Sequence, residues 1–313
     1  MPERVLVGIE IGGSKLQAVT GDPQGNIFTT VEVAADATGG APSILAQLEA
    51  MVGQLLSSAN ANVVGIGIGF GGPVDAPRGT VIKSNHVDGW ENVSLRDWAA
   101  KQFQLPSAVG NDTDLAAVAE ARVGGGKHDR CIFYTNIGSG IGGGLVVDGQ
   151  LYARPRGAME VGHNRVYSEL DERHGILEEF CSGWSLNHRA QAAAQQDKNS
   201  LMWSLSGSRL EAIDAVTLFD AWEKNDQAAS RVVDCFLDCY ARTMSNVIAL
   251  LNPDVIIIGG GVAQRGAPLL GAIRRRTSEF VYEPFAGAYR IELTCLGKQA
   301  VPIGSLLLAA ENL

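Results

Sequence analysis

The chain has 313 residues, of which 46% are hydrophobic and 19% charged, a composition typical of a folded globular protein and long enough for two domains. Its formal net charge of −9 argues against a nucleic-acid or anionic-membrane partner, because either one requires a basic surface. No apolar run approaches the roughly 18 residues of a membrane span, and the N-terminus lacks the apolar core of a signal peptide, so we expect a cytoplasmic protein.

The first predicted unit is a β-hairpin at the N-terminus. Val5 to Val19, VLVGIEIGGSKLQAV, reads as strand, glycine turn and strand, and a short strand follows at 26–29. Apolar residues recur at helical spacing from Ile44 to Leu56 after Pro42, which predicts an amphipathic helix. Val63 to Phe70, VVGIGIGF, alternates with glycine, as a buried strand does when another backbone packs against its glycine face.

The middle of the chain is predicted to repeat this pattern. After a helix at 94–103, a strand at 107–109 and a helix at 114–122 comes TNIGSGIGGGLVV, which contains the dinucleotide-binding spacing Gly138-x-Gly140-x-x-Gly143. That fingerprint needs a helix after its glycines. Here Leu145 to Val147 favours a strand and Asp148-Gly149 a hairpin turn, so the segment is a second strand, glycine turn and strand. Two such units imply a duplicated architecture with a cleft between the halves.

The second half is predicted to contain a long helix followed by a buried strand. The helical pattern from Val232 to Leu251 stops at Asn252-Pro253-Asp254. The all-apolar strand Val255 to Ile258 leads into three glycines, and a final helix at 305–312 is expected to pack on the N-terminal domain. The cysteines form no C-x-x-C pair and we expect all of them to be reduced: Cys131, Cys181, Cys235, Cys239 and Cys295.

Seven motifs in order resemble the ROK family of sugar kinases and related repressors, a branch of the actin-like ATPase superfamily. They are IEIGGSK at 9–15, GFGGPVD at 69–75, GND at 110–112, IGSGIGGG at 137–144, GAMEVGH at 157–163, LEEFCSG at 177–183 and NPDVIIIGGG at 252–261. The resemblance implies an α/β fold of two actin-like (ribonuclease H-like) domains with a duplicated hairpin and helix core and an interdomain cleft. We expect a small N-terminal domain of residues 1–113, completed by a C-terminal helix at 303–313, and a larger domain of residues 114–302.

The resemblance also implies an activity. Repressor members carry an extra N-terminal DNA-binding domain, whereas the first glycine loop here starts within a dozen residues of Met1, so we expect the kinase branch. The implied enzyme is a glucokinase-like hexose kinase that uses ATP and Mg²⁺, with Asp112 as the base for the sugar C6 hydroxyl. From the residues alone, Asp112 is equally well read as a helix N-cap. Glucose is the expected sugar, with N-acetylglucosamine, mannose and fructose as alternatives, and the implied assembly is a homodimer.

The resemblance assigns two further groups of residues. Glycine turns suit phosphates because backbone amides approach closely where no Cβ intervenes, although a tight turn without a ligand is the alternative for each. The expected ATP-binding residues are Gly12, Gly13, Ser14, Lys15, Gly138, Ser139, Gly140, Gly142, Gly260 and Gly261. The expected sugar-binding residues are Gly72, Asn111, Asp112, Glu160, His163 and Glu178, with Asn85 as a further candidate whose spacing to Trp90 is one residue longer than expected.

The chain departs from the family pattern in the loop after His163. Many members carry three cysteines there that bind zinc together with the histidine. Residues 164–177 contain no cysteine, and His174 is the only additional histidine. Because a structural zinc site needs four ligands, we expect no zinc, and we expect packing to hold the loop instead.

A second departure is Glu10, which stands where the family has an aspartate that helps to orient the metal and the transferred phosphate. The longer side chain moves the carboxylate by on the order of 1 Å, which can cost roughly a hundredfold in a reaction governed by positioning. Two readings stay open. Either the site has adjusted around Glu10, with Lys15 balancing its charge, or the protein is a sugar-binding or regulatory protein that has lost kinase activity.

Overall fold

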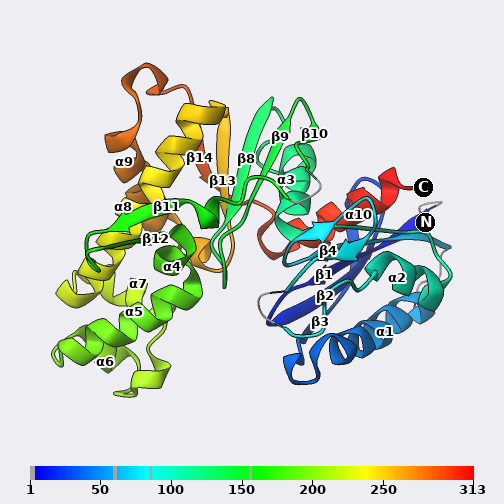
Figure 1. The fold of residues 1–313 in the computed structure, drawn as a ribbon, viewed down its shortest axis with the longest axis horizontal. Coiled ribbons are helices and arrows are strands. Elements are labelled where there is room, and N and C mark those ends of the chain that lie inside the picture. Colours follow the sequence, from blue (N-terminus) through cyan, green and yellow to red (C-terminus); the bar gives the residue numbers. More distant parts are fainter. Residues whose placement is uncertain (1–3, 59–61, 85–86, 155–156) are drawn as a thin grey trace. The chain divides into compact units, whose positions relative to one another are not determined.

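The computed structural model of the chain describes residues 4–58, 62–84, 87–154 and 157–313 (Figure 1). Two compact units are present, the first made of residues 1–128, 144–158 and 295–313 and the second of residues 129–143 and 159–294. Each unit is therefore assembled from separate stretches of the sequence.

Strands and helices alternate along the chain, as expected of an α/β protein. Up to residue 123 the elements are β1 (Val5–Ile11), β2 (Lys15–Gly21), β3 (Ile27–Ala34), α1 (Gly40–Ser58), β4 (Val63–Phe70), β5 (Val74–Asp75), β6 (Thr80–Val81), α2 (Leu95–Phe103), β7 (Ser107–Asn111) and α3 (Asp112–Val123). They continue with β8 (Cys131–Asn136), β9 (Gly143–Val147), β10 (Gln150–Leu151), β11 (Arg165–Ser168), β12 (Arg173–Ile176), α4 (Leu177–Cys181), α5 (Gly183–Gln196), α6 (Leu201–Leu205), α7 (Ala215–Trp222), α8 (Gln227–Leu251), β13 (Val255–Gly259), α9 (Ala267–Phe280), β14 (Arg290–Leu293) and α10 (Ala300–Glu311).

The predicted duplication is visible in the strand pairing. In the first unit β1 pairs antiparallel with β2, and the parallel strands lie in the order β1, β4, β7. In the second unit the parallel strands lie in the order β8, β13, β14, so each set begins with the strand that leads into a glycine turn. The hairpin between β9 and β10 closes with Asp148 at φ 49° and Gly149 at φ 76°, the paired positive φ values that the Asp-Gly sequence predicts.

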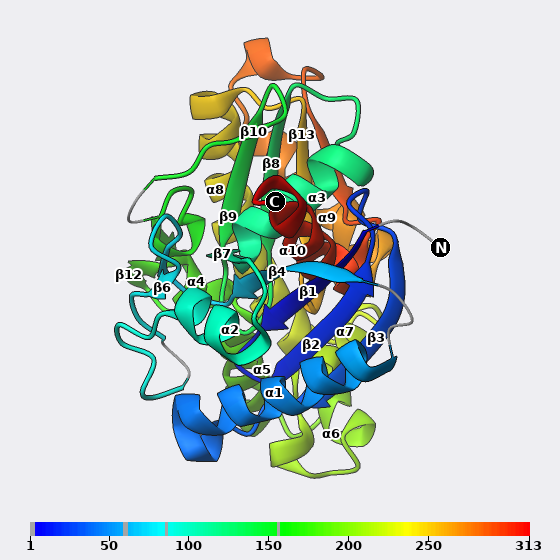
Figure 2. The same ribbon diagram turned by 90° about the vertical axis from the view of Figure 1, so that its right-hand side faces the viewer.

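The first unit has helices on both faces of its sheet (Figure 2). Side chains alternate along β1, so that Ile9 packs into the core with Ile44 of α1, whereas Leu6 packs with Leu306 of α10. The glycine-rich face of β4 is covered closely by α10, because a Cβ on Gly67 would overlap the carbonyl oxygen of Ser305. The alternating glycines of β4 therefore serve close backbone packing, as predicted.

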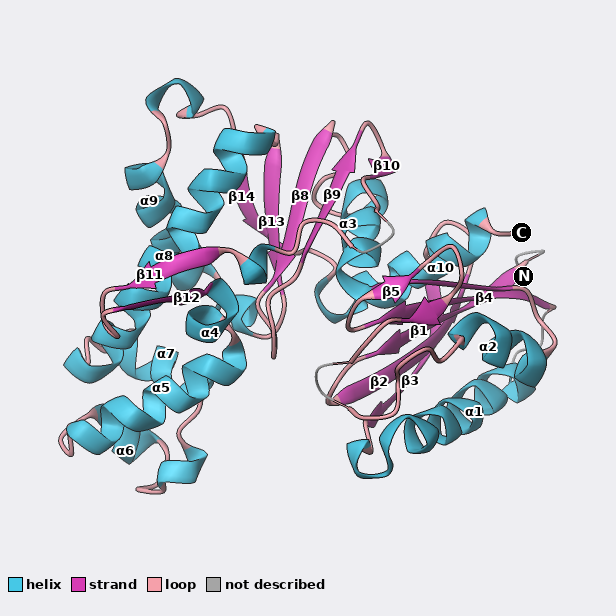
Figure 3. Ribbon diagram, in the orientation of Figure 1, coloured by secondary structure: helices cyan, strands magenta, loops and turns pink. Residues whose placement is uncertain are grey.

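The second unit is organised around α8, which contacts α4, α5, α7 and α9 (Figure 3). The predicted apolar side of this helix is buried, including Phe236, Tyr240 and Ile248. The helix ends at Asn252, whose left-handed φ of 44° forms the C-cap ahead of Pro253. The next strand, β13, is buried along its whole length, which explains its uninterrupted apolar sequence.

The cysteines are reduced, as the sequence predicts. All five cysteines are free thiols, and Cys181, Cys235 and Cys239 are buried. In the part of the chain that the structure describes, no helix combines the length and the apolar character needed to span a membrane.

Candidate active site

The first predicted phosphate loop is the turn between β1 and β2. The amide of Gly12 donates to the carbonyl of Lys15 at 3.0 Å, which closes the turn. The amide of Gly71, which follows β4, donates to the carbonyl of Ile11 at 2.9 Å. Ser14 at the tip is exposed. The loop is thus fixed at its base while its tip faces outward.

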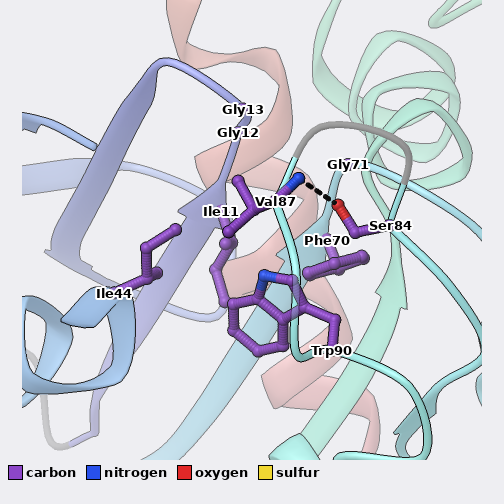
Figure 4. A pocket seen from close by; sticks show the side chains of 9 residues that line it. All are labelled: Ile11, Gly12, Gly13, Ile44, Phe70, Gly71, Ser84, Val87 and Trp90. Atoms are coloured by element: carbon purple, nitrogen blue, oxygen red, sulfur yellow. Dashed lines mark hydrogen bonds between the residues drawn. The ribbon is translucent and has the colours of Figure 1, made fainter. Parts of the chain in front are cut away.

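A pocket lies beside this loop (Figure 4). Trp90 and Phe70 form an apolar part of its wall, with their rings edge to face at 5.0 Å between centroids. The amide of Val87 donates to Ser84 Oγ at 3.2 Å. The candidate Asn85 lies outside the described residues. The full lining comprises Ile11, Gly12, Gly13, Ile44, Phe70, Gly71, Ser84, Val87 and Trp90.

The helix cap beside the predicted base is Asn111. Its Oδ1 accepts from the amides of Thr113 at 2.9 Å and Asp114 at 3.1 Å, while Asp112 is the first residue of α3. The N-cap reading of Asp112 is therefore wrong, since the cap is its neighbour. The Nδ2 of Asn111 donates to the carbonyl of Gly72 at 3.0 Å, so this side chain also ties the end of β7 to the segment after β4.

The carboxylate of Asp112 lies next to the first glycine loop. A Cβ built on Gly71 would lie 3.2 Å from the carbonyl oxygen of Ile11, 3.4 Å from Asp112 Oδ2 and 3.8 Å from Gly12 Cα. Strands β1, β4 and β7 are parallel and in register, so their carboxyl ends meet at one edge of the sheet. In open α/β sheets this edge is where ligands bind. The structure therefore gathers the predicted residues of the first unit at one place.

Glu10, near the end of β1, is partly buried, with 17% of its side-chain surface exposed, and forms an ion pair. Lys15 Nζ lies 3.2 Å from Glu10 Oε2 and donates to Gln17 Oε1 at 3.2 Å. Among the described residues, Glu10 Oε2 accepts no hydrogen bond. Burial raises the pKa of Glu10, and the charge of Lys15 opposes this effect. The carboxylate oxygen thus keeps acceptor capacity for another cation.

The second predicted phosphate loop joins β8 to β9. The amide of Gly138 donates to the carbonyl of Gly140 at 2.9 Å, and the amide of Gly142 donates to Asn136 Oδ1 at 2.7 Å. Gly183, the first residue of α5, donates to the carbonyl of Gly138 at 2.7 Å. The loop is therefore anchored by β8 and by the start of α5.

The glycine turn after β13 packs on the same loop. Ile137 donates its amide to the carbonyl of Gly259 at 2.9 Å and accepts from the amide of Val262 at 3.0 Å. Gly260 has φ of 86°, and a Cβ there would lie 2.5 Å from the carbonyl oxygen of Ile137. Close packing and a left-handed backbone both require this glycine. The two predicted nucleotide elements of the second unit thus lie together.

Gly138 and Gly261 are glycines that internal packing does not explain. A Cβ on Gly138 would meet its nearest neighbours at 3.8 Å, an ordinary contact, and a Cβ on Gly261 would meet nothing within 4 Å. Neither residue has a positive φ. Space left beside these backbones fits the close approach of a phosphate to peptide amides.

We expect Gly138→Ala to raise the KM for ATP about tenfold, comparable to the loss of one hydrogen bond to a charged group, without lowering Tm. Steady-state kinetics with varied ATP and thermal unfolding test this. Gly53→Ala is the matched control, because a Cβ on Gly53 in α1 also meets nothing within 4 Å, and it should leave the kinetics unchanged. A KM for ATP unaffected by Gly138→Ala contradicts the phosphate role.

The three predicted sugar-binding residues of the second unit are neighbours. Glu160 precedes the short 3₁₀ helix Val161–His163 as its N-cap residue, His163 is the last residue of that helix, and Glu178 lies in the first turn of α4. Glu178 Oε2 accepts from the amide of Ile141 at 2.7 Å, so it is also tied to the glycine loop. Partial desolvation raises the pKa of Glu160, the charge of His163 lowers it and that of Glu178 raises it. Their combination offers both acceptors and a donor for sugar hydroxyls.

The segment after His163 forms the hairpin of β11 and β12, which polar contacts hold in place. Asp171 accepts hydrogen bonds from Ser168 and, at 2.7 Å, from Arg189 of α5. Ser168 Oγ lies 3.2 Å from Cys235 Sγ of α8. The sequence predicts that packing holds this loop, and the structure adds these polar contacts to it. The contacts with Arg189 and Cys235 join residues that are distant in sequence, so no local pattern indicates them.

These residues do not fit a zinc ion. Within residues 4–58, 62–84, 87–154 and 157–313, no group of three or more His, Cys, Asp and Glu side chains is arranged to hold a metal. A hydrogen bond with Cys239 and burial raise the pKa of Cys235, which favours the thiol over the thiolate that zinc binds.

Asp171→Asn should lower Tm near neutral pH by on the order of 4 °C, because it removes the charge from two hydrogen bonds. Burial acts to raise the pKa of Asp171, but the bonds from Ser168 and Arg189 outweigh it, and the net shift is downward. A lowered carboxyl pKa stabilises the fold above the unfolded-state value of 3.8 and loses this effect as pH falls through the folded-state value. The Tm difference should vanish in acid, and a pH-independent difference contradicts the assignment.

Comparison with known proteins matches the model of the ROK family to residues 6–312. A glucokinase of Thermotoga maritima is 28% identical over 320 aligned residues, which cover 100% of this chain and 99% of that protein. The similarity therefore extends over both chains from end to end.

Solved structures with the same fold include a ROK family glucokinase from Streptomyces griseus in complex with glucose and AMPPNP. Its TM-score is 0.86 at 27% identity, covering 98% of this chain and 99% of that one. A ROK family transcriptional regulator, a homologue of the E. coli MLC protein, has a TM-score of 0.84 at 22% identity and is covered over 78% of its length, a likeness that shows the fold alone. The predicted two-domain α/β class and the family resemblance are confirmed.

Proposed function

Because the chain belongs to the ROK family and is a sugar kinase, we propose that it transfers the γ-phosphate of ATP to the C6 hydroxyl of a hexose, with glucose as the preferred substrate. The glucokinase of Thermotoga maritima is similar over its whole length. The Streptomyces griseus glucokinase with this fold was solved with glucose and an ATP analogue.

The position of Asp112 is the observation that supports this proposal most. Its neighbour Asn111 caps α3, so the carboxylate of Asp112 is not needed as the cap. One carboxylate oxygen borders the edge of the first glycine loop. A carboxylate at that edge is suited to accept the proton of a sugar hydroxyl as the phosphoryl group is transferred.

The other predicted residues take supporting roles in this proposal. Glu160, His163 and Glu178 hold sugar hydroxyls, and Gly72 and Asn111 are further sugar-binding residues in this proposal. The residues Gly12, Gly13, Ser14 and Lys15 and the residues Gly138, Ser139, Gly140 and Gly142 hold phosphate oxygens, while Gly260 and Gly261 border the adenine. Phosphoryl transfer needs such positioning and charge stabilisation more than covalent participation by the protein.

Magnesium is proposed to accompany ATP, and Glu10 is the residue of this chain that orients it. The fit rests on Glu10 Oε2, a buried oxygen 3.2 Å from Lys15 Nζ that accepts no hydrogen bond among the described residues. Magnesium usually keeps several waters and takes one or two carboxylates together with substrate phosphates, so a single protein carboxylate suffices. The ion would offset the charge on the phosphates.

The alternative function is a sugar-binding regulatory protein without kinase activity. The fold shared with the ROK transcriptional regulator and the replacement of aspartate by Glu10 favour it. Against it, Asp112 and both glycine loops are present and placed at strand ends. Both functions predict sugar binding, but only the kinase predicts ADP release from ATP in the presence of a sugar.

The test is ADP release from purified protein with ATP and Mg²⁺ across glucose, N-acetylglucosamine, mannose and fructose, combined with sugar binding by calorimetry. Turnover is expected on glucose above the others. Sugar binding with no ADP release above background would establish the regulatory alternative. Turnover on another hexose would keep the kinase and replace glucose.

The proposal carries three further expectations. We place the enzyme in the cytoplasm, where ATP is available. We propose a homodimer, which light scattering of the purified protein tests. We also keep the division into a domain of residues 1–113 with 303–313 and a domain of residues 114–302, which limited proteolysis tests.

A further inference from the structure

Trp184 is an exposed aromatic residue with no role in the site described above. It is the second residue of α5, and 64% of its surface is accessible. An indole buries a large apolar area when it is covered, so leaving it exposed forgoes stabilisation. Single exposed apolar residues are common on protein surfaces, so the neighbours of Trp184 decide whether its exposure is functional.

The start of α5 places Trp184 beside both nucleotide elements of the second unit. Its neighbour Gly183 donates to the carbonyl of Gly138 at 2.7 Å. A Cβ on Gly183 would lie 2.9 Å from that carbonyl oxygen and 3.7 Å from Val262 Cγ2, which follows the glycine turn after β13. Trp184 therefore follows directly on a residue wedged between the phosphate loop and that turn.

One end of the loop between β8 and β9 contacts a residue assigned to the sugar, and the other end contacts elements assigned to the nucleotide. Trp184 lies next to the nucleotide end. The Gly140 and Ile141 end of the loop contacts Glu178, one of the residues assigned to the sugar. The Gly138 end contacts α5 and the turn assigned to adenine. Since Trp184 follows the residue that contacts the Gly138 end, it lies next to the part of the loop assigned to the nucleotide.

The indole is held by the next turn of the helix. The ring of His188 lies 4.2 Å from that of Trp184 between centroids, at an interplanar angle of 45°. His188 Nδ1 donates to the carbonyl of Trp184 at 2.8 Å, which fixes the imidazole. A supported ring loses little conformational entropy when a second flat group stacks on it.

We propose that Trp184 stacks on the purine base of the bound nucleotide and so contributes to the affinity for ATP and ADP. The inference rests on the proposed use of ATP. Stacking acts on the π face that every base has, so ATP and GTP should gain by similar factors. It adds an aromatic side chain to a nucleotide site whose other assigned residues are mostly glycines.

Trp184→Ala is expected to raise the Kd for ADP by about 5- to 100-fold, the range of base stacking on an aromatic side chain. Trp184→Phe should recover most of the affinity, because a smaller aromatic ring still stacks. The Kd for inorganic tripolyphosphate should stay within about twofold, since it has no base. Calorimetry with Mg²⁺ on the full chain measures all three without relying on sugar turnover.

Tyr282→Ala is the control, because Tyr282 is also exposed in the second unit, at 66%, and lies outside both nucleotide elements. It should leave the Kd for ADP unchanged. An equal loss of ADP and tripolyphosphate affinity in Trp184→Ala overturns the proposal in favour of support for the loop. A changed oligomeric state with unchanged ADP affinity overturns it in favour of a subunit contact. If no sugar is phosphorylated but ADP affinity falls as expected, the kinase assignment fails and the stacking role stands.

Discussion

Asp112→Asn should lower kcat for sugar phosphorylation by about 10²- to 10⁴-fold, the usual contribution of a general base. Asparagine keeps the size of the side chain and an oxygen that can accept from the amide of Thr113, which Asp112 Oδ1 now does at 2.8 Å. It cannot take up a proton at neutral pH. The KM for the sugar and Tm should change little, because Asn111 still caps the helix. Initial rates of ADP release at saturating ATP, with Tm measured in parallel, test this.

Asp97→Asn provides the matched control for this experiment. Asp97 also lies in the first turn of its helix, α2, and its side chain is 76% exposed. Both substitutions remove a favourable interaction with a helix N-terminus, on the order of 0.5 kcal/mol. Only Asp112→Asn should affect catalysis. A variant at Asp112 that keeps more than about a tenth of the wild-type kcat would rule out the general-base role.

Glu10→Gln should reduce kcat about a hundredfold, because the amide cannot orient a cation as the carboxylate does. It should not reduce Tm near neutral pH. Glutamine removes the free-energy cost of desolvating the Glu10 carboxylate. Lys15 keeps its ion pair with Glu32, at 4.0 Å between Nζ and Oε2, and its side chain remains partly exposed. A gain of about 1 kcal/mol corresponds to roughly 1 to 2 °C in Tm for a chain of this size. Loss of activity with unchanged or higher Tm separates a functional carboxylate from a structural one.

The pH dependence of this Tm difference follows from the pKa of Glu10. Burial raises this pKa above its ordinary value of 4.5, so well below pH 4.5 the carboxyl is neutral in both the folded and the unfolded protein. As pH rises through the folded-state pKa, the wild type must ionise a buried group and loses stability, whereas Glu10→Gln does not. The Tm advantage of the variant should therefore grow as pH rises above about 4.5 and level off once pH exceeds the raised folded-state pKa. An advantage that shrinks with rising pH contradicts the raised pKa.

Glu10→Asp tests whether the site has adjusted to the longer side chain. Aspartate withdraws the carboxylate by on the order of 1 Å from Lys15, and such a displacement can cost roughly a hundredfold. The ion pair of Glu10 with Lys15 at 3.2 Å leads us to expect a loss of kcat. A large gain in kcat would show instead that Glu10 weakens the site and would favour the regulatory alternative.

The sequence predicted those elements whose pattern is local. Glycine turns flanked by strands gave both hairpins, and the Asn-Pro pair gave the end of α8. Alternating glycines in Val63 to Phe70 indicated close backbone packing, which α10 supplies. These signals are readable because steric limits on the backbone and the periods of helix and strand act between residues near in sequence.

The sequence alone also determined the family, the α/β class and the order of the candidate residues along the chain. Only the tertiary structure decided that Asn111 and not Asp112 is the cap, and that Glu10 pairs with Lys15. It also decided that Arg189 holds Asp171 in the hairpin after His163, and that Gly183, the neighbour of Trp184, contacts the loop between β8 and β9. Each of these depends on distances between side chains or on burial. Those quantities are set when distant segments pack, and a linear pattern of residues does not contain them.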